Sequence, residues 1–88
     1  YALDEQSVGR GITSEAVQLM VQFAFEHLQI NRVEAYVSPQ NTASIRVLEK
    51  TGFLREGLLK ELLYINGYWE DHYLYAITKS KYETDLGN

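Results

Sequence analysis

Polar residues recur at steps of three and four in the first third of the chain, between Thr13 and Gln29. They are Glu15, Gln18, Gln22, Glu26 and Gln29. This spacing places them on one stripe of a helix, and the apolar residues between them form a wide opposite face. Thr13 or Ser14 can cap the start, and Glu15 suits the positive end of the helix dipole. The pattern predicts a helix over residues 13–29 whose apolar face lies on a sheet or on another helix.

Residues 32–37 alternate apolar and polar side chains with the period of a β-strand. The apolar positions are Val33, Ala35 and Val37. A strand-like segment, residues 1–3, precedes the first helix. The helix therefore lies between two strands, as in a β-α-β unit.

A second, shorter helix is predicted at about residues 42–51. Pro39 ends the strand region before it, Asn41 is a favourable N-cap, and Gly52 favours the end of a helix.

The last predicted element is a long hairpin between residues 53 and 77. This segment is rich in Leu, Tyr and Ile, and Asn66-Gly67 interrupts it with the strongest two-residue hairpin pattern. Counting outward pairs Ile65 with Tyr68, Tyr64 with Trp69, and Glu61 with His72, provided that no bulge shifts the register. Residues 79–88 are expected to form a polar, fraying tail.

These elements predict one domain of the α/β (α+β) class, with a mixed sheet of about four strands and two helices. Two helices cover little of such a sheet, so at least one edge is expected to be bare and available for a homodimer.

Composition limits the classes of function. With 88 residues, 45% hydrophobic and 23% charged, the chain suits one small globular domain. We find neither a membrane span nor a signal peptide, so we expect a cytoplasmic protein. The absence of cysteine excludes disulfides, thiolate zinc sites and cysteine nucleophiles, and two separate histidines predict no metal site. The net charge of −4 weighs against direct binding of nucleic acid.

Two glycines, Gly9 and Gly11, stand on either side of Arg10 just before the first helix. A helix start offers unpaired N–H groups that suit an anion, so the turn can be a phosphate cradle. By itself such a short motif favours the alternative of a tight connection between strand and helix, which explains the glycines without a ligand.

Several stretches resemble one family in the same order along the chain. "QSVGRG" resembles the Gln/Arg-x-x-Gly-x-Gly/Ala acetyl-coenzyme A motif of the GNAT superfamily of N-acyltransferases. "SPQNTASIRVLEKTGF" resembles the segment that follows it there, and "EGLLKELLYINGYWEDHYLYAI" resembles the closing hairpin of the branch that acetylates ribosomal-protein N-termini. The resemblance implies that residues 1–79 are the C-terminal, acetyl-CoA-binding half of such a domain, and that residues 80–88 are a polar tail.

The same resemblance implies a set of cofactor contacts. Backbone N–H groups around the glycines would wrap the pyrophosphate of coenzyme A, the Leu3 backbone would contact the pantetheine, and Asn41 and Ser44 would face the pantetheine arm. The cofactor-binding residues so implied are Leu3, Gln6, Val8, Gly9, Arg10, Gly11, Ile12, Thr13, Asn41 and Ser44. Asn41 acting only as an N-cap is a sufficient explanation of that residue.

The catalytic roles are less complete. Many relatives place a tyrosine that protonates the leaving thiolate where this chain has Leu48, and the resemblance suggests Ser44 as the substitute acid. A second cap or a surface hydroxyl is the alternative for Ser44. For the base, Leu63 stands where some relatives have glutamate, which leaves a cross-strand pair of Glu61 and His72 as the candidate, against a plain surface ion pair.

The resemblance implies transfer of acetyl from acetyl-CoA to a primary amine, with a ribosomal-protein N-terminus as the expected partner. An α-amine is about a tenth to a fifth neutral at pH 7, whereas a lysine amine is neutral in well under about a thousandth of molecules. Without a strong base, the α-amine is the easier nucleophile. The alternatives are a polyamine or other small amine as acceptor, and an inactive fragment that binds coenzyme A or a protein partner.

Overall fold

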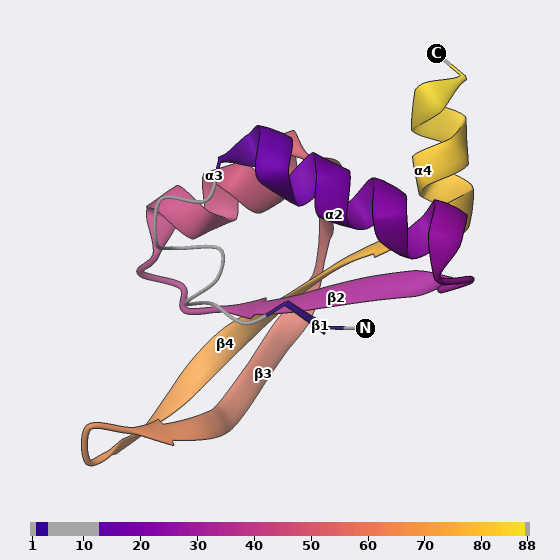
Figure 1. The fold of residues 1–88 in the computed structure, drawn as a ribbon. Helices are drawn as coiled ribbons and strands as arrows, with labels where there is room; N and C mark the ends of the chain where they lie inside the picture. The colour runs from indigo at the N-terminus through magenta and orange to yellow at the C-terminus, as the bar shows by residue number, and fades with distance from the viewer. Residues whose placement is uncertain (1, 4–12, 88) are drawn as a thin grey trace.

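The structure is a computed structural model, and it describes residues 2–3 and 13–87. Its elements follow the predicted order and add a third helix (Figure 1). They are β1 (Ala2–Leu3), α2 (Ser14–His27), β2 (Arg32–Val37), α3 (Thr42–Lys50), β3 (Leu54–Ile65), β4 (Tyr68–Thr78) and α4 (Lys79–Leu86).

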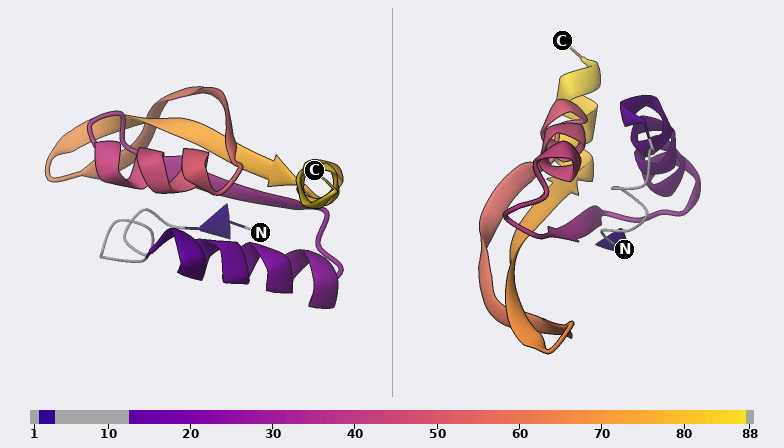
Figure 2. Two further views of the ribbon diagram at one scale, coloured as in Figure 1. Left: turned by 90° about the horizontal axis from the view of Figure 1, so that it is seen from above. Right: turned by 90° about the vertical axis from the view of Figure 1, so that its left-hand side faces the viewer.

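The described strands form one mixed sheet in the order β1-β2-β4-β3. β1 pairs with β2 in parallel, and the other two pairings are antiparallel. Helices α2 and α3 lie side by side over the same side of β2, while the hairpin of β3 and β4 curls away from them (Figure 2). The predicted fold class and the four-stranded mixed sheet are confirmed.

The core lies between this face of the sheet and the helices. Val33, Ala35 and Val37 are each 1% exposed, as the alternating pattern predicted. The other buried members of this cluster are Val17, Val21, Ala24, Phe25, Leu48, Phe53, Tyr75 and Ile77. Because α2 and α3 both contribute to one cluster, packing holds both helices against the sheet.

Both predicted helix starts are confirmed. Thr13 caps α2 by accepting a hydrogen bond from the Ala16 N–H at 3.2 Å, and Asn41 caps α3 by accepting one from the Ser44 N–H at 3.1 Å. After α3, Gly52 adopts a φ of +98°, a conformation that side-chain-bearing residues rarely adopt.

The hairpin follows the predicted register only near its turn. Ile65 pairs with Tyr68 and Tyr64 with Trp69, but an irregularity between Leu59 and Leu63 shifts the pairing. The predicted pair of Glu61 and His72 is therefore wrong, and His72 lies opposite Leu59.

The expected fraying of the C-terminal segment is wrong for Lys79–Leu86, which forms α4. Thr78 caps this helix, and Lys81 forms an i,i+4 ion pair with Asp85 at 2.6 Å. Tyr82 packs on Phe25 with ring centroids 5.2 Å apart, and its hydroxyl donates to Glu26 at 2.7 Å. The N-cap and one aromatic contact with α2 thus stabilise a helix in this polar segment.

Candidate functional site

Much of the predicted phosphate cradle falls outside the described residues. This holds for Gln6, Val8, Gly9, Arg10, Gly11 and Ile12. Leu3 lies in β1, where it pairs with Ala35 of β2.

The start of α2 is described, and it carries a negative charge. The Thr13 hydroxyl accepts from the Ala16 N–H, which leaves its own proton free to donate. The pKa of Glu15 lies below its usual range, because its own backbone N–H and the Thr13 side chain hydrogen-bond to the carboxylate. An anion that approaches this helix end therefore meets the positive end of the dipole and one ionised side chain.

The start of α3 places a polar group inside the core. Ser44 is 0% exposed, and its hydroxyl has no hydrogen-bond partner among the described residues. The alternative that Ser44 is a surface hydroxyl is wrong. A buried hydroxyl without a partner costs free energy, so it is a group that a ligand can satisfy.

One turn after Ser44, Leu48 is also 0% exposed and belongs to the core cluster. Residues four apart lie on the same helix face. Ser44 and Leu48 therefore share the buried face of α3, and Ser44 is the polar one of the two. Leu48 has no proton to give, whereas the Ser44 hydroxyl, the acid candidate that the family resemblance suggests, does.

The two residues expected to supply the base do not meet. Glu61 is exposed, adopts a φ of +50° and donates its backbone N–H to Asp71 Oδ1 at 2.8 Å. His72 is 1% exposed and lies opposite Leu59. Neither a catalytic pair nor a surface ion pair forms between Glu61 and His72.

A polar cluster that the sequence did not indicate joins three elements at Tyr75. The Tyr75 hydroxyl donates to Glu49 Oε2 of α3 at 2.9 Å and accepts from Arg55 Nε of β3 at 3.1 Å. The Arg55 guanidinium lies 3.9 Å from the centre of the Tyr73 ring. Burial and the Glu49 carboxylate raise the pKa of Tyr75, although the Arg55 guanidinium opposes them.

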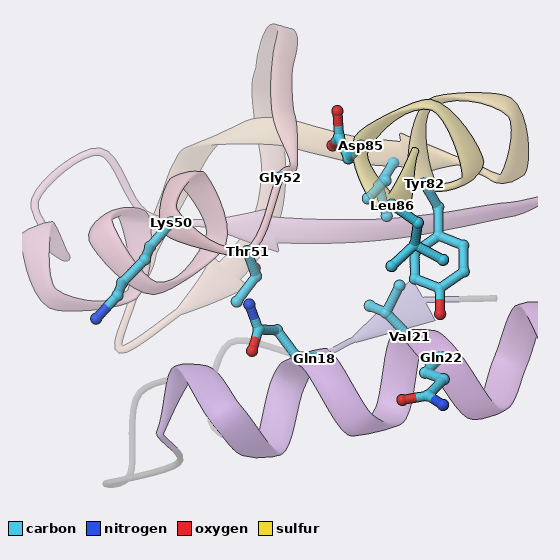
Figure 3. A pocket seen from close by; sticks show the side chains of 10 residues that line it. Gln18, Val21, Gln22, Lys50, Thr51, Gly52, Tyr82, Asp85 and Leu86 are labelled. Atoms are coloured by element: carbon cyan, nitrogen blue, oxygen red, sulfur yellow. The ribbon is translucent and has the colours of Figure 1, made fainter. Parts of the chain in front are cut away.

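A hollow of about 400 Å³ opens between α2, the end of α3 and α4 (Figure 3). Its walls are Gln18, Val21, Gln22, Lys50, Thr51, Gly52, Ile77, Tyr82, Asp85 and Leu86. Figure 3 shows Gln18 of α2 pointing toward Thr51 at the end of α3. Among the described residues, no predicted site residue lines this hollow.

A comparison with protein families settles the kind of domain. The family model for the acetyltransferase (GNAT) domain matches residues 1–54. The chain belongs to the GNAT acetyltransferase family. GNAT acetyltransferases use acetyl-CoA, so the start of α2 and the start of α3 are the parts of this GNAT chain to compare with a coenzyme A site.

Similar proteins support the same assignment. The "Probable N-acetyltransferase YjcK" of Bacillus subtilis is 51% identical over 77 residues, which are 88% of this chain and 42% of that protein. The "[Ribosomal protein uS5]-alanine N-acetyltransferase" of Escherichia coli is 33% identical over 78 residues, 89% of this chain and 40% of that protein.

Among solved structures, RimJ of Mycobacterium smegmatis in complex with CoA-disulfide superposes with a TM-score of 0.77 at 44% identity. The match covers 81% of this chain and 34% of RimJ. This GNAT chain therefore spans less than half the length of each of these three relatives.

Within the described residues, no helix is long and apolar enough to span a membrane. The same part of the chain contains no group of three or more histidine, aspartate and glutamate side chains placed to hold a metal ion.

Proposed function

We propose that the protein is an acetyl-CoA-dependent N-acetyltransferase whose acceptor is a protein N-terminal α-amine, as in the ribosomal-protein branch of the family. The observation that carries the proposal is the buried Ser44 hydroxyl, which has no partner among the described residues and lies in the first turn of α3. It stands one turn before Leu48, where many relatives have the tyrosine acid.

In this proposal, two helix starts hold acetyl-CoA, the source of an acetyl group activated as a thioester. The glycine turn and the N-terminus of α2 hold the pyrophosphate, because helix N–H groups suit anions. Asn41 and Ser44 face the pantetheine arm. The residues present fit the group, since Ser44 brings an unsatisfied hydroxyl to an otherwise apolar helix face.

The chain's own residues then have three tasks in acetyl transfer: they polarise the carbonyl, leave the amine free to attack and protonate the leaving group. The strand backbone would polarise the acetyl carbonyl, and the acceptor amine would attack it directly, so that the C–N bond forms as the C–S bond breaks. The Ser44 Oγ–H would give a proton to the departing sulfur, and the proton released by the amine nitrogen would pass through water to restore Ser44. A neutral α-amine needs no strong base, whereas a lysine amine does. The 33% identity to the uS5-alanine N-acetyltransferase also favours the α-amine. Such an acceptor would be met in the cytoplasm.

Two measurements test the proposal. Calorimetric titration of coenzyme A should give saturable binding that a Gly11→Glu variant loses, because that variant places a negative side chain in the glycine turn. Acetylation should then be compared with three acceptors: a peptide with a free N-terminal alanine, the same peptide blocked at its N-terminus with one internal lysine, and spermidine.

Faster transfer to the free N-terminus is expected. Preference for spermidine would replace the acceptor class by a polyamine. Binding without transfer to any acceptor would support an inactive coenzyme A-binding module. Absence of binding by a folded chain would contradict the proposed cofactor site.

A further inference from the structure

Three elements of the fold meet at one buried hydroxyl, that of Tyr75. Tyr75 belongs to β4 and is 0% exposed. Its hydroxyl donates to Glu49 Oε2 in α3 at 2.9 Å and accepts a hydrogen bond from Arg55 Nε in β3 at 3.1 Å. The Arg55 guanidinium also lies over the Tyr73 ring, 3.9 Å from its centre. Both hydrogen-bonding capacities of the phenol are used.

We propose that the Tyr75 hydroxyl is a positioning group, which sets the rotation and depth of α3 and thereby the placement of Ser44 for acetyl transfer. The inference rests on the proposed function, because it assigns Tyr75 a part in that same site. Tyr75 does not touch the reacting groups and acts only through α3.

The shape of α3 explains why such a group is needed. The helix has nine residues, of which Ser44 and Leu48 are buried, and Ile45 and Val47 pack against the core cluster. These apolar contacts hold the helix on the sheet, but they are not directional and set its rotation less sharply than a hydrogen bond does. A hydrogen bond depends steeply on angle, so the bond from Tyr75 to Glu49 fixes the rotation of the helix. Glu49 follows Ser44 by five residues, about 7.5 Å along the axis.

The rest of the cluster holds the tyrosine in turn. Arg55 lies directly opposite Tyr75 in the β3–β4 pairing, and its guanidinium packs on Tyr73. A phenylalanine at this position would fill the same core volume. Core packing therefore explains the aromatic ring of Tyr75 but not its hydroxyl. Glu49 and Arg55 are both exposed and can turn to water when the hydroxyl is removed. The loss should therefore appear in the placement of α3 more than in overall stability.

The chain offers a matched control at Tyr82. Its hydroxyl donates to Glu26 Oε2 at 2.7 Å and joins α4 to α2. Burial and the Glu26 carboxylate raise its pKa to about 12. Tyr82→Phe removes a hydrogen bond of the same kind, from a tyrosine hydroxyl to a glutamate, but this bond does not involve α3.

The experiment compares Tyr75→Phe, Glu49→Ala, Glu49→Gln and Tyr82→Phe with the wild type. We expect kcat for acetyl transfer to fall about tenfold or more in Tyr75→Phe and Glu49→Ala, because small misplacements of reacting groups are costly. The two effects should not add in the double variant, since both break one contact. Glu49→Gln keeps an acceptor oxygen and should remain within about twofold of the wild type.

Amide hydrogen exchange gives a readout that does not depend on activity. Exchange in α3 should accelerate in Tyr75→Phe and Glu49→Ala, and not in Tyr82→Phe or Glu49→Gln. Unchanged kcat and unchanged α3 exchange in Tyr75→Phe would overturn the inference. If Tyr75→Phe does not fold, Glu49→Ala and Glu49→Gln test the inference instead. Unchanged kcat and unchanged α3 exchange in Glu49→Ala would then overturn it. A wild type that binds coenzyme A but transfers acetyl to no amine would defeat the proposed function, and α3 exchange would then still decide whether Tyr75 fixes the helix.

Discussion

At the scale of single residues, the two helix starts of the proposed site differ in charge. The α3 start carries a neutral hydroxyl on an apolar face, whereas the α2 start carries the ionised Glu15. The backbone N–H of Glu15 and the Thr13 side chain keep the pKa of Glu15 low, so it remains charged at neutral pH. In the proposed site, it would therefore repel the phosphates that the dipole of α2 attracts.

Replacing Glu15 by glutamine should strengthen coenzyme A binding about two- to fivefold at low salt, because a like charge leaves the helix end. Calorimetric titration at 20 and 200 mM salt measures this, and the gain should shrink at the higher salt as screening increases. Glu83→Gln, an exposed change on α4, is the control and should leave the affinity unchanged. A weaker binding in Glu15→Gln would mean that Glu15 contacts the ligand favourably.

Ser44→Ala should separate activity from stability. The hydroxyl has no partner among the described residues, so its removal should leave the unfolding midpoint unchanged or slightly higher. The rate of acetyl transfer should fall about a hundredfold or more if Ser44 is the acid. Ser80→Ala, an exposed change, controls for the general effect of losing a hydroxyl. Loss of stability with full activity would make Ser44 a structural residue instead.

At the scale of elements, short sequence patterns predicted the features that depend on neighbouring residues, namely the helix starts and the hairpin turn. The polar stripe and the two N-caps located α2 and α3, and Asn66-Gly67 fixed the first two pairs of the hairpin. The bulge could not be predicted, because no glycine marks Glu61, whose φ is +50°. This shift and a second one between Arg55 and Gly57 together hid the Tyr75 cluster, since counting outward from the turn without bulges does not bring Arg55 opposite Tyr75. Helix α4 was missed because its segment lacks an apolar period, and its contact with α2 depends on tertiary packing.

Glu61→Gly tests the bulge and the catalytic hypothesis together. A non-glycine residue at positive φ costs about 1 kcal/mol, and glycine removes that cost while retaining the N–H bond to Asp71. We expect a gain of up to about 1 kcal/mol in the free energy of unfolding, measured in urea. Glu70→Gly, in the opposite strand, should be destabilising. Acetyl transfer should survive in Glu61→Gly, and its loss would restore Glu61 as a candidate base.

At the scale of the whole molecule, the two faces of the sheet differ in chemistry. One face is covered by helices and is apolar, and the other carries a charged network across three strands. Arg32 of β2 donates Nε to Glu34 Oε2 at 2.8 Å and reaches over β4 to Glu56 of β3, which it contacts through both terminal nitrogens. Tyr36 donates its hydroxyl to Glu34 at 2.8 Å. The network ties the outer hairpin strand to β2 on the face that the helices leave open.

This network predicts how stability depends on pH. Hydrogen bonds from Arg32 hold the pKa of both Glu34 and Glu56 below the usual value of 4.5. A depressed pKa in the folded state stabilises the protein above pH 4.5, and this contribution is lost as pH falls through the folded values. Arg32→Met should therefore lower the urea midpoint at pH 7, and the difference from the wild type should shrink between pH 4.5 and pH 3. Lys60→Met is the control, because Lys60 and Asp71 are 3.7 Å apart with side chains 75% and 36% exposed, so little should change. A difference that stayed constant with pH would mean that Arg32 stabilises the sheet through its aliphatic stem and not through its charge.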